Sequence, residues 1–218
     1  MIAFIAGSIS IKRLSRAATQ RLDSIIAKGY EIVVGDAGGV DKAVQRHLYE
    51  RHYVNVTVYC INRPRNNLGA WPVASIATTE KRPKRSDFAI KDRAMAERAD
   101  AGFMIWDDRS PGTLNNVLNL LSSGKQSLVY LHNADEFLWI TGREELKALV
   151  DRIPPEEREA VDEKTGVFER MQDLDPASSY EIKPVSQSVR ESQLDLFGLD
   201  GDAPGGLLQP GAEKGEHA

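Results

Sequence analysis

The 218-residue sequence lacks several features that would assign a protein to a class at once. It holds a single cysteine, Cys60, which rules out an intrachain disulfide framework. No apolar run approaches the roughly 18–20 residues of a membrane helix, so we expect no membrane partner. The apolar start, Met1–Gly7, has no basic segment or cleavage-like site and predicts a first strand rather than a signal peptide. These absences favour a cytoplasmic protein.

Two common phosphate-binding signatures are also missing. There is no G-x-x-x-x-G-K-[ST] sequence, which argues against a P-loop NTPase. The dinucleotide fingerprint G-x-G-x-x-G should follow the first strand, but the turn there has one glycine, Gly7. His47 and His52 have no cysteine or acidic partners in a ligand spacing, so we expect no structural metal. The sequence identifies no cofactor besides a nucleotide-type ligand.

Charge is divided unevenly along a chain whose formal net charge is −4. Residues 1–133 carry 19 Lys and Arg against 12 Asp and Glu, whereas residues 134–218 carry 9 against 20. A basic N-terminal part and an acidic C-terminal part predict an anion-binding domain followed by a solvated extension. We expect short acidic helices over 134–165 and a largely disordered tail over 166–218, where the apolar periodicity fades.

Short apolar runs alternate with helical spacing through the first part of the chain. Apolar residues every three to four positions, as in Leu14–Ile26, indicate helices between the apolar runs. Alternating strands and helices predict right-handed crossovers and a parallel sheet. The expected fold class is therefore α/β, a Rossmann-like doubly wound parallel sheet of about five strands at Ile2–Ala6, Glu31–Gly35, Asn55–Ile61, Ala101–Trp106 and Ser127–Leu131.

The segment Asn62–Arg85 interrupts the alternation of strands and helices and is expected to be a long loop. It contains three prolines and the basic run Lys81–Arg85. Such a run is typical of a solvated loop face, and it also suits contacts with nucleic-acid phosphates. Because no aromatic residues are interleaved with it, direct nucleic-acid binding has little support in the sequence.

The most informative stretch is Val33–Asp41, where a strand leads into a turn with three glycines and then into a helix. Glycine lets a ligand approach the main chain, and a helix start offers unpaired N–H groups and a positive dipole end. Ligands of doubly wound sheets bind outside the carboxyl ends of the strands. Three polar turns fall at such ends, at Gly7–Ser10, Gly35–Asp41 and Asp107–Thr113. Their convergence favours a ligand site over three plain turns.

These turns resemble the SLOG superfamily of SMF/DprA–LOG-like Rossmannoid domains, and especially its small YspA-like branch. The resemblance covers about residues 1–132 and implies a nucleotide or nucleotide-derived ligand. It is also compatible with a homodimer paired through helix faces. It rests on Gly7-Ser8, on Gly35-Asp36-Ala37-Gly38-Gly39-Val40-Asp41, on Lys91-Asp92-Arg93-Ala94-Met95, and on Trp106-Asp107-Asp108 with Ser110-Pro111-Gly112-Thr113-Leu114-Asn115-Asn116.

The resemblance implies roles for residues at strand ends and helix starts. Main-chain N–H groups around Gly38-Gly39 and Gly112-Thr113 would hold phosphate. Asp36 or Asp41 would meet ribose hydroxyls, and Arg93 would pair with a phosphate as a bidentate donor. The expected ligand-binding residues are Gly7, Ser8, Gly35, Asp36, Gly38, Gly39, Asp41, Arg93, Asp107, Ser110, Gly112, Thr113 and Asn116.

The resemblance leaves two functions open, ligand binding without turnover and cleavage of a nucleotide. Superfamily members that cut the base from a nucleoside monophosphate resemble P-G-G-x-G-T-x-x-E with an arginine on the preceding helix. Arg93 stands in for that arginine, but Asn115-Asn116 follow Gly112-Thr113, so the expected glutamate is replaced by asparagine. A carboxylate usually assists the oxocarbenium-like transition state. Arg93, Asp36 and Asp41 are the candidate catalytic residues; we favour binding without turnover, with a nucleotide N-glycosidase as the alternative.

The tail contains one apolar pentapeptide, Gln193-Leu194-Asp195-Leu196-Phe197, in a polar surrounding. It resembles the bacterial sliding-clamp-binding motif, which implies the clamp as a partner and a DNA-linked adaptor as a further alternative function. A tethered peptide of this kind binds with modest affinity because it must become ordered. A chance pentamer, or a segment folding back onto the domain, explains the same residues.

Overall fold

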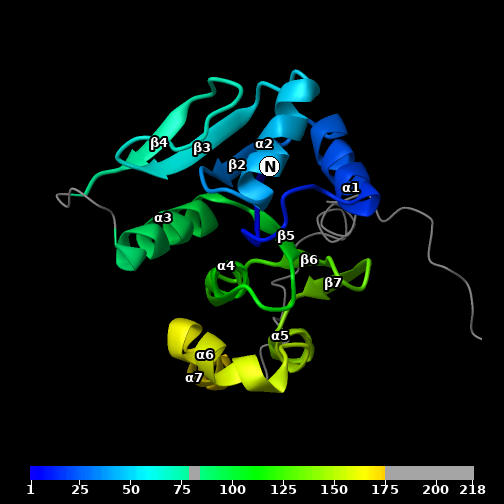
Figure 1. Cartoon of the computed structure of the whole chain (residues 1–218), viewed down its shortest axis with the longest axis vertical. Helices are drawn as coiled ribbons and strands as arrows, with labels where there is room; N and C mark the ends of the chain where they lie inside the picture. The colour runs from blue at the N-terminus through cyan, green and yellow to red at the C-terminus, as the bar shows by residue number, and fades with distance from the viewer. Residues whose placement is uncertain (79–83, 175–218) are drawn as a thin grey trace, which may run out of the picture.

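The computed structural model describes residues 1–78 and 84–174. A single seven-stranded sheet, in the order β4-β3-β2-β1-β5-β6-β7, is covered by helices on both faces (Figure 1). All neighbouring strands pair in parallel except β7, which is antiparallel to β6. The Rossmann-like α/β prediction is confirmed, with seven strands instead of about five. The strands are β1 (Ile2–Gly7), β2 (Glu31–Gly35), β3 (Val56–Ile61), β4 (Val73–Ile76), β5 (Ala101–Trp106), β6 (Ser127–Leu131) and β7 (Glu136–Ile140).

The two faces of the sheet carry separate apolar layers. Successive strand residues point to opposite faces, so Ile5 packs with α1 and α2 whereas Phe4 packs with α3 and α4. The chain runs from β1 to β4 on one side of β1 and returns to β5 on the other. This reversal makes the space above β1 and β5 the topological switch point, where open α/β sheets bind ligands. The helices are α1 (Arg16–Ala27), α2 (Val40–Glu50), α3 (Arg85–Arg98), α4 (Pro111–Ser122), α5 (Arg143–Asp151), α6 (Pro155–Thr165) and α7 (Val167–Asp173).

The edge strand β4 lies inside the segment that we expected to be a loop. It has four residues, and their side chains are only partly covered, so it lacks the apolar run that marks the inner strands. No helix separates it from β3. Trp71 covers the sheet there instead: its ring is buried with the α1 and α2 layer and its indole N–H donates to the Tyr53 carbonyl at 2.8 Å.

The acidic segment after residue 133 continues the same fold. It begins with β7, and the helices behind it place Leu146, Val161 and Met171 in the apolar layer beneath α4. The folded unit therefore extends past both expected boundaries, at 133 and at 165, because each short helix contributes a few buried side chains to a shared core. Within residues 1–78 and 84–174, no helix is long and apolar enough to cross a bilayer.

Two stretches singled out in the sequence lie outside the described residues. They are the centre of the basic run, Lys81–Pro83, and the pentapeptide Gln193–Phe197. The nucleic-acid contact and the clamp contact that they suggest stay predictions.

Candidate functional site

The turns after β1 and β5 are tied together by Asp107. The buried Ser8 hydroxyl donates to Asp107 Oδ1 at 2.8 Å, and Ser10 donates to the other carboxylate oxygen. The backbone N–H of Ser110 also donates to Oδ1, at 2.8 Å. Burial opposes ionisation of Asp107, but these hydrogen bonds outweigh it and lower the pKa of the carboxyl below its ordinary value. Asp107 is thus an ionised acceptor that fixes the two loops.

The start of α4 combines a capped end with an open surface. Ser110 is the N-cap, and its hydroxyl accepts from the Thr113 N–H and from the Thr113 hydroxyl, the latter at 3.2 Å. At Gly112 an added Cβ would have no described heavy atom within 4 Å. Asn116, one turn further, is buried, and its Oδ1 has no hydrogen-bond partner among the described residues.

The glycine turn after β2 is shaped by the first loop of the chain. Gly39 has φ +68°, and a Cβ there would lie 2.4 Å from Ile9 Cα, so only glycine fits between the two backbones. The N–H of Val40 donates to the Ser8 carbonyl at 3.2 Å, which docks the start of α2 on the same loop. Gly38, by contrast, has open space around its Cα.

Asp36 lies in an ion pair that the sequence did not reveal. Its buried carboxylate accepts from Arg65 Nη2 at 2.7 Å, and from Arg65 Nε and the Arg65 backbone N–H at 3.0 Å each. Burial opposes the charge, yet the bonds from Arg65 lower the pKa of Asp36. Asn66 also donates to the Asp36 carbonyl at 2.8 Å. The loop after β3 therefore engages the carboxylate that we expected to meet a ribose.

Beneath the glycine turn lies a buried charge cluster of Asp41, Lys91 and Asp92. Lys91 is 4% exposed, and its Nζ is 2.9 Å from Asp92 Oδ1. Asp41 is 6% exposed and accepts from the Ala37 N–H at 3.1 Å. A Cβ on Gly35 would lie 2.3 Å from Asp41 Oδ2 and 2.9 Å from Lys91 Nζ, so this glycine makes room for both side chains. Burial raises the pKa of Asp41 to about 6, against the attraction of Lys91.

This raised pKa predicts a pH-dependent stability. The folded state binds the Asp41 proton more tightly than the unfolded state, where the pKa is 3.8, so Asp41 contributes less stability as pH rises from about 4 to about 6. Between about pH 4 and pH 7, the free energy of unfolding of the wild type should fall by roughly 2–3 kcal/mol relative to Asp41→Asn. Urea unfolding of both proteins across this range measures it; parallel pH profiles would contradict the prediction.

Arg93 does not join this cluster. Its side chain is 76% exposed and its Nε lies 3.3 Å from Glu97 on the same helix. Residues two positions apart on a helix point in nearly opposite directions, so Lys91 faces the glycine turn while Arg93 faces away. The basic residue of α3 at the turn is therefore Lys91, and Arg93 lines a separate groove on the α4 side of α3.

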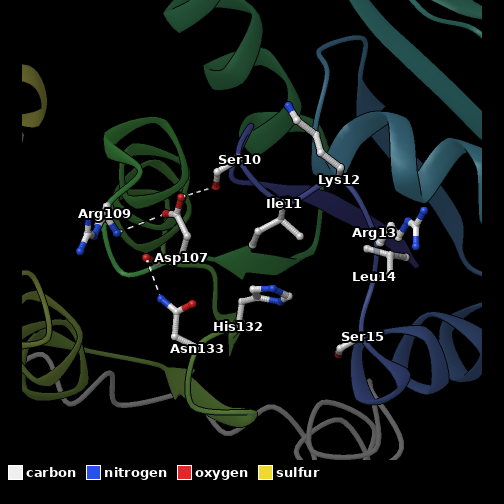
Figure 2. A pocket seen from close by; sticks show the side chains of 10 residues that line it. All are labelled: Ser10, Ile11, Lys12, Arg13, Leu14, Ser15, Asp107, Arg109, His132 and Asn133. Carbon is white, nitrogen blue, oxygen red and sulfur yellow. Dashed lines mark hydrogen bonds between the residues drawn. The ribbon is translucent and has the colours of Figure 1, made fainter.

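A cavity of about 730 Å³ opens at the switch point, within the size range of small-ligand sites. Figure 2 shows Asp107 and Asn133 on one side of it, Leu14 and Ser15 on the other, and His132 between them. The cavity is lined by Ser10, Ile11, Lys12, Arg13, Leu14, Ser15, Asp107, Arg109, His132 and Asn133.

Positive charge dominates the rim of this cavity. Lys12 donates to the Ile9 carbonyl, and Arg109 Nη1 lies 3.2 Å from Glu157. Arg13 has no ion-pair partner within the part of the chain that the structure describes, and His132 Nδ1 is buried there without a hydrogen bond. The cavity thus offers an exposed cation and a buried imidazole nitrogen, neither of which has a partner among the described residues.

Sequence reasoning placed the loops at this edge but missed most of the residues that line the cavity. Lys12-Arg13 follow the first turn directly, and His132-Asn133 follow β6. Basic and polar residues just past a strand end were the available signal. Of the expected set, only Asp107 lines the cavity, and hydrogen bonds join it to Ser8 and Ser110, which in turn contact Thr113. Gly7 packs beneath Val40. Gly35, Asp36 and Asp41 form the neighbouring buried layer.

Comparison with known proteins adds little to this description. No protein-family model and no curated protein matches the sequence. A solved structure of DNA processing protein A from Helicobacter pylori, described for its single-stranded DNA binding mode, is similar to this chain at 15% identity and a TM-score of 0.48. The similarity covers 80% of this chain and 82% of that one. The assignment to the YspA-like branch stays a prediction.

Proposed function

We propose that the protein binds a nucleotide or nucleotide-derived ligand in the cavity above β1 and β5. The observation that carries the proposal is Arg13, without an ion-pair partner among the described residues, at a cavity of about 730 Å³ placed at the switch point of the sheet. An anionic group beside Arg13 would offset its charge with hydrogen bonds that a guanidinium forms in pairs. A phosphate is therefore the group that we place there.

The rest of the lining suits the other parts of such a ligand. Leu14 is partly buried and offers apolar surface for a flat base, in the same lining as the His132 ring. Asp107 and the amide oxygen of Asn133 offer acceptors for ribose hydroxyls, while Asn133 Nδ2 donates to the Asp107 carbonyl and to Asp108. Because Asp107 already binds Ser8 and Ser10, it is held in place before a ligand arrives, which lowers the ordering cost of binding.

We further propose binding without hydrolysis of the N-glycosidic bond. Asn116 stands where the superfamily's glutamate is expected, and an amide does not transfer protons at neutral pH. The lowered pKa of Asp107 makes it a poor proton donor. Asp41 has a pKa of about 6, suitable for a general acid, but its carboxyl is enclosed beneath the glycine turn. This pKa of Asp41 is the observation that keeps a nucleotide N-glycosidase as the second candidate function.

Calorimetric titration with nucleoside monophosphates tests the binding proposal. Arg13→Gln should weaken binding about tenfold or more, because a charge-assisted hydrogen bond contributes roughly 1.5–3 kcal/mol. Arg16→Gln is the matched control: it removes the same charge from an exposed position outside the cavity, and its affinity should equal that of the wild type. The proposal fails if no nucleoside monophosphate binds, or if both variants bind as the wild type does.

The same mixtures, analysed for free base by chromatography, separate binding from turnover. We expect no base release. Base release that is lost in Asp41→Asn would establish the hydrolase instead.

A further inference from the structure

A second groove, of about 500 Å³, lies between α3, α4 and α7 and shares no residue with the cavity above β1 and β5. In Figure 1, α4 runs between α3 on one side and the α6–α7 pair on the other. The groove is lined by Ala89, Ile90, Arg93, Asn115, Asn119, Ser122, Ser123 and Arg170.

Arg170 is the half-buried cation of this groove. Its Nη1 donates to Asn115 Oδ1 at 2.9 Å and its Nη2 to Asn119 Oδ1 at 3.1 Å. Within residues 1–78 and 84–174 it has no carboxylate partner. Burial, and then the nearby Arg93, lower the pKa of Arg170. Two positive side chains therefore share a groove in which, among the described residues, the half-buried Arg170 is offset by neutral oxygens alone.

The polar part of the remaining lining consists of side chains that can donate hydrogen bonds, beside the apolar Ala89 and Ile90. Asn115 and Asn119 lie one turn apart on α4, and both direct their oxygens at Arg170. Their Nδ2 amino groups are left as donors, because an amide that accepts through its oxygen can still donate through its nitrogen. Arg93 forms the opposite wall, and its contact with Glu97 at 3.3 Å joins two exposed side chains. Such surface pairs are weak and exchange easily.

We propose that this groove is a second anion site that binds the phosphoryl groups of a diphosphate or of a phosphodiester chain. Two guanidinium groups and two amides need several acceptor oxygens on one ligand, which a diphosphate or two neighbouring phosphodiesters supply and a single carboxylate does not. The anion would also relieve the repulsion between Arg93 and Arg170. The free diphosphate and the nucleic-acid backbone share this chemistry, and the test separates them.

Inorganic pyrophosphate, titrated into the full chain and followed by NMR, is the direct probe. The side-chain amide signals of Asn115 and Asn119 should shift on binding, and Arg93→Gln should raise Kd about tenfold or more. Arg98→Gln is the matched control, since Arg98 lies on the same helix but pairs with Glu31 outside the groove, and it should bind as the wild type does. Arg170→Lys keeps the charge but loses the two-pronged contact with the asparagines, and it should also weaken binding.

Two further measurements identify the source of the phosphate and test whether this groove binds independently of the cavity above β1 and β5. If the Asn115 and Asn119 signals respond to short oligodeoxythymidylate at lower concentrations than to pyrophosphate, the phosphodiester backbone is the ligand; the reverse order indicates a free diphosphate. Arg13→Gln, which tests the cavity above β1 and β5, should leave these shifts unchanged. Absence of shifts with both probes, or an unchanged Kd in Arg93→Gln, would overturn the proposal.

Discussion

Gly39→Ala is expected to destabilise the protein by about 3–5 kcal/mol. An L residue at φ +68° and ψ −131° is strained by roughly 1–3 kcal/mol, and forcing a methyl group into a filled space costs a similar amount. The methyl would meet the backbone of Ile9 at 2.4–2.6 Å, and backbone atoms cannot swing aside as a side-chain end can. The start of α2 and the first loop would have to separate, so ligand binding in the nearby cavity should weaken as well.

Gly38→Ala is the matched control for this prediction. It adds the same methyl one residue earlier, where no described heavy atom lies within 4 Å and φ is not positive. Its free energy of unfolding should stay within about 0.5 kcal/mol of the wild type. Urea unfolding followed by far-UV circular dichroism gives both values, provided that the slope with urea is unchanged. Equal unfolding midpoints for the two variants would show that the close approach to Ile9 does not require a glycine at position 39.

Lys91→Met should cost about 3–5 kcal/mol at pH 8, the typical loss when one partner of a buried ion pair is removed. The methionine side chain fills nearly the same space, so the loss is electrostatic and not a cavity. Without the ammonium, the Asp41 and Asp92 carboxylates have lost the positive charge that attracts both of them. Arg93→Met removes a charge two residues further along α3 from an exposed pair, and it should cost less than about 1 kcal/mol.

The Lys91→Met loss should also depend on pH. In the wild type the pKa of Asp41 is about 6, and removing Lys91 raises it further because Lys91 favours the ionised form. At about pH 5 the carboxyl is then protonated and needs no counter-charge, so the loss should be smaller than at about pH 8. Urea unfolding at both pH values measures the difference. If Lys91→Met loses the same unfolding free energy at about pH 5 and about pH 8, or no more than Arg93→Met does, Lys91 does not stabilise the ionised Asp41 and Asp92 carboxylates.

The inner strands of the sheet were predictable because each is a short apolar run buried on both faces. β1, β2, β3, β5 and β6 all carry this local signature. The strands that were missed lie at the two edges, where only part of each strand is covered. The sequence did predict short acidic helices where α5 and α6 lie, but not α7 or the packing of all three beneath α4. Each of these helices buries too few residues to signal a core by itself.

In the candidate site, too, some features follow from local sequence patterns and others depend on tertiary packing. The sequence located three turns at one sheet edge, since the carboxyl ends of parallel strands share an edge. It gave no indication that Arg65 would engage Asp36, or that Lys91 rather than Arg93 would reach the glycine turn. The first depends on the path of the loop after β3, and the second on the rotation of α3 about its axis.

By itself, then, the sequence determined the alternation of strands and helices, the parallel sheet and the edge at which its polar turns gather. These follow from patterns that repeat within a few residues. The tertiary structure decided which charges are paired inside the protein and which are not: Asp36 is paired by Arg65, Asp41 lies near Lys91, and Arg13 stays unpaired among the described residues. Ion pairing depends on distances of a few ångströms between residues far apart in the chain, and only packing sets those distances.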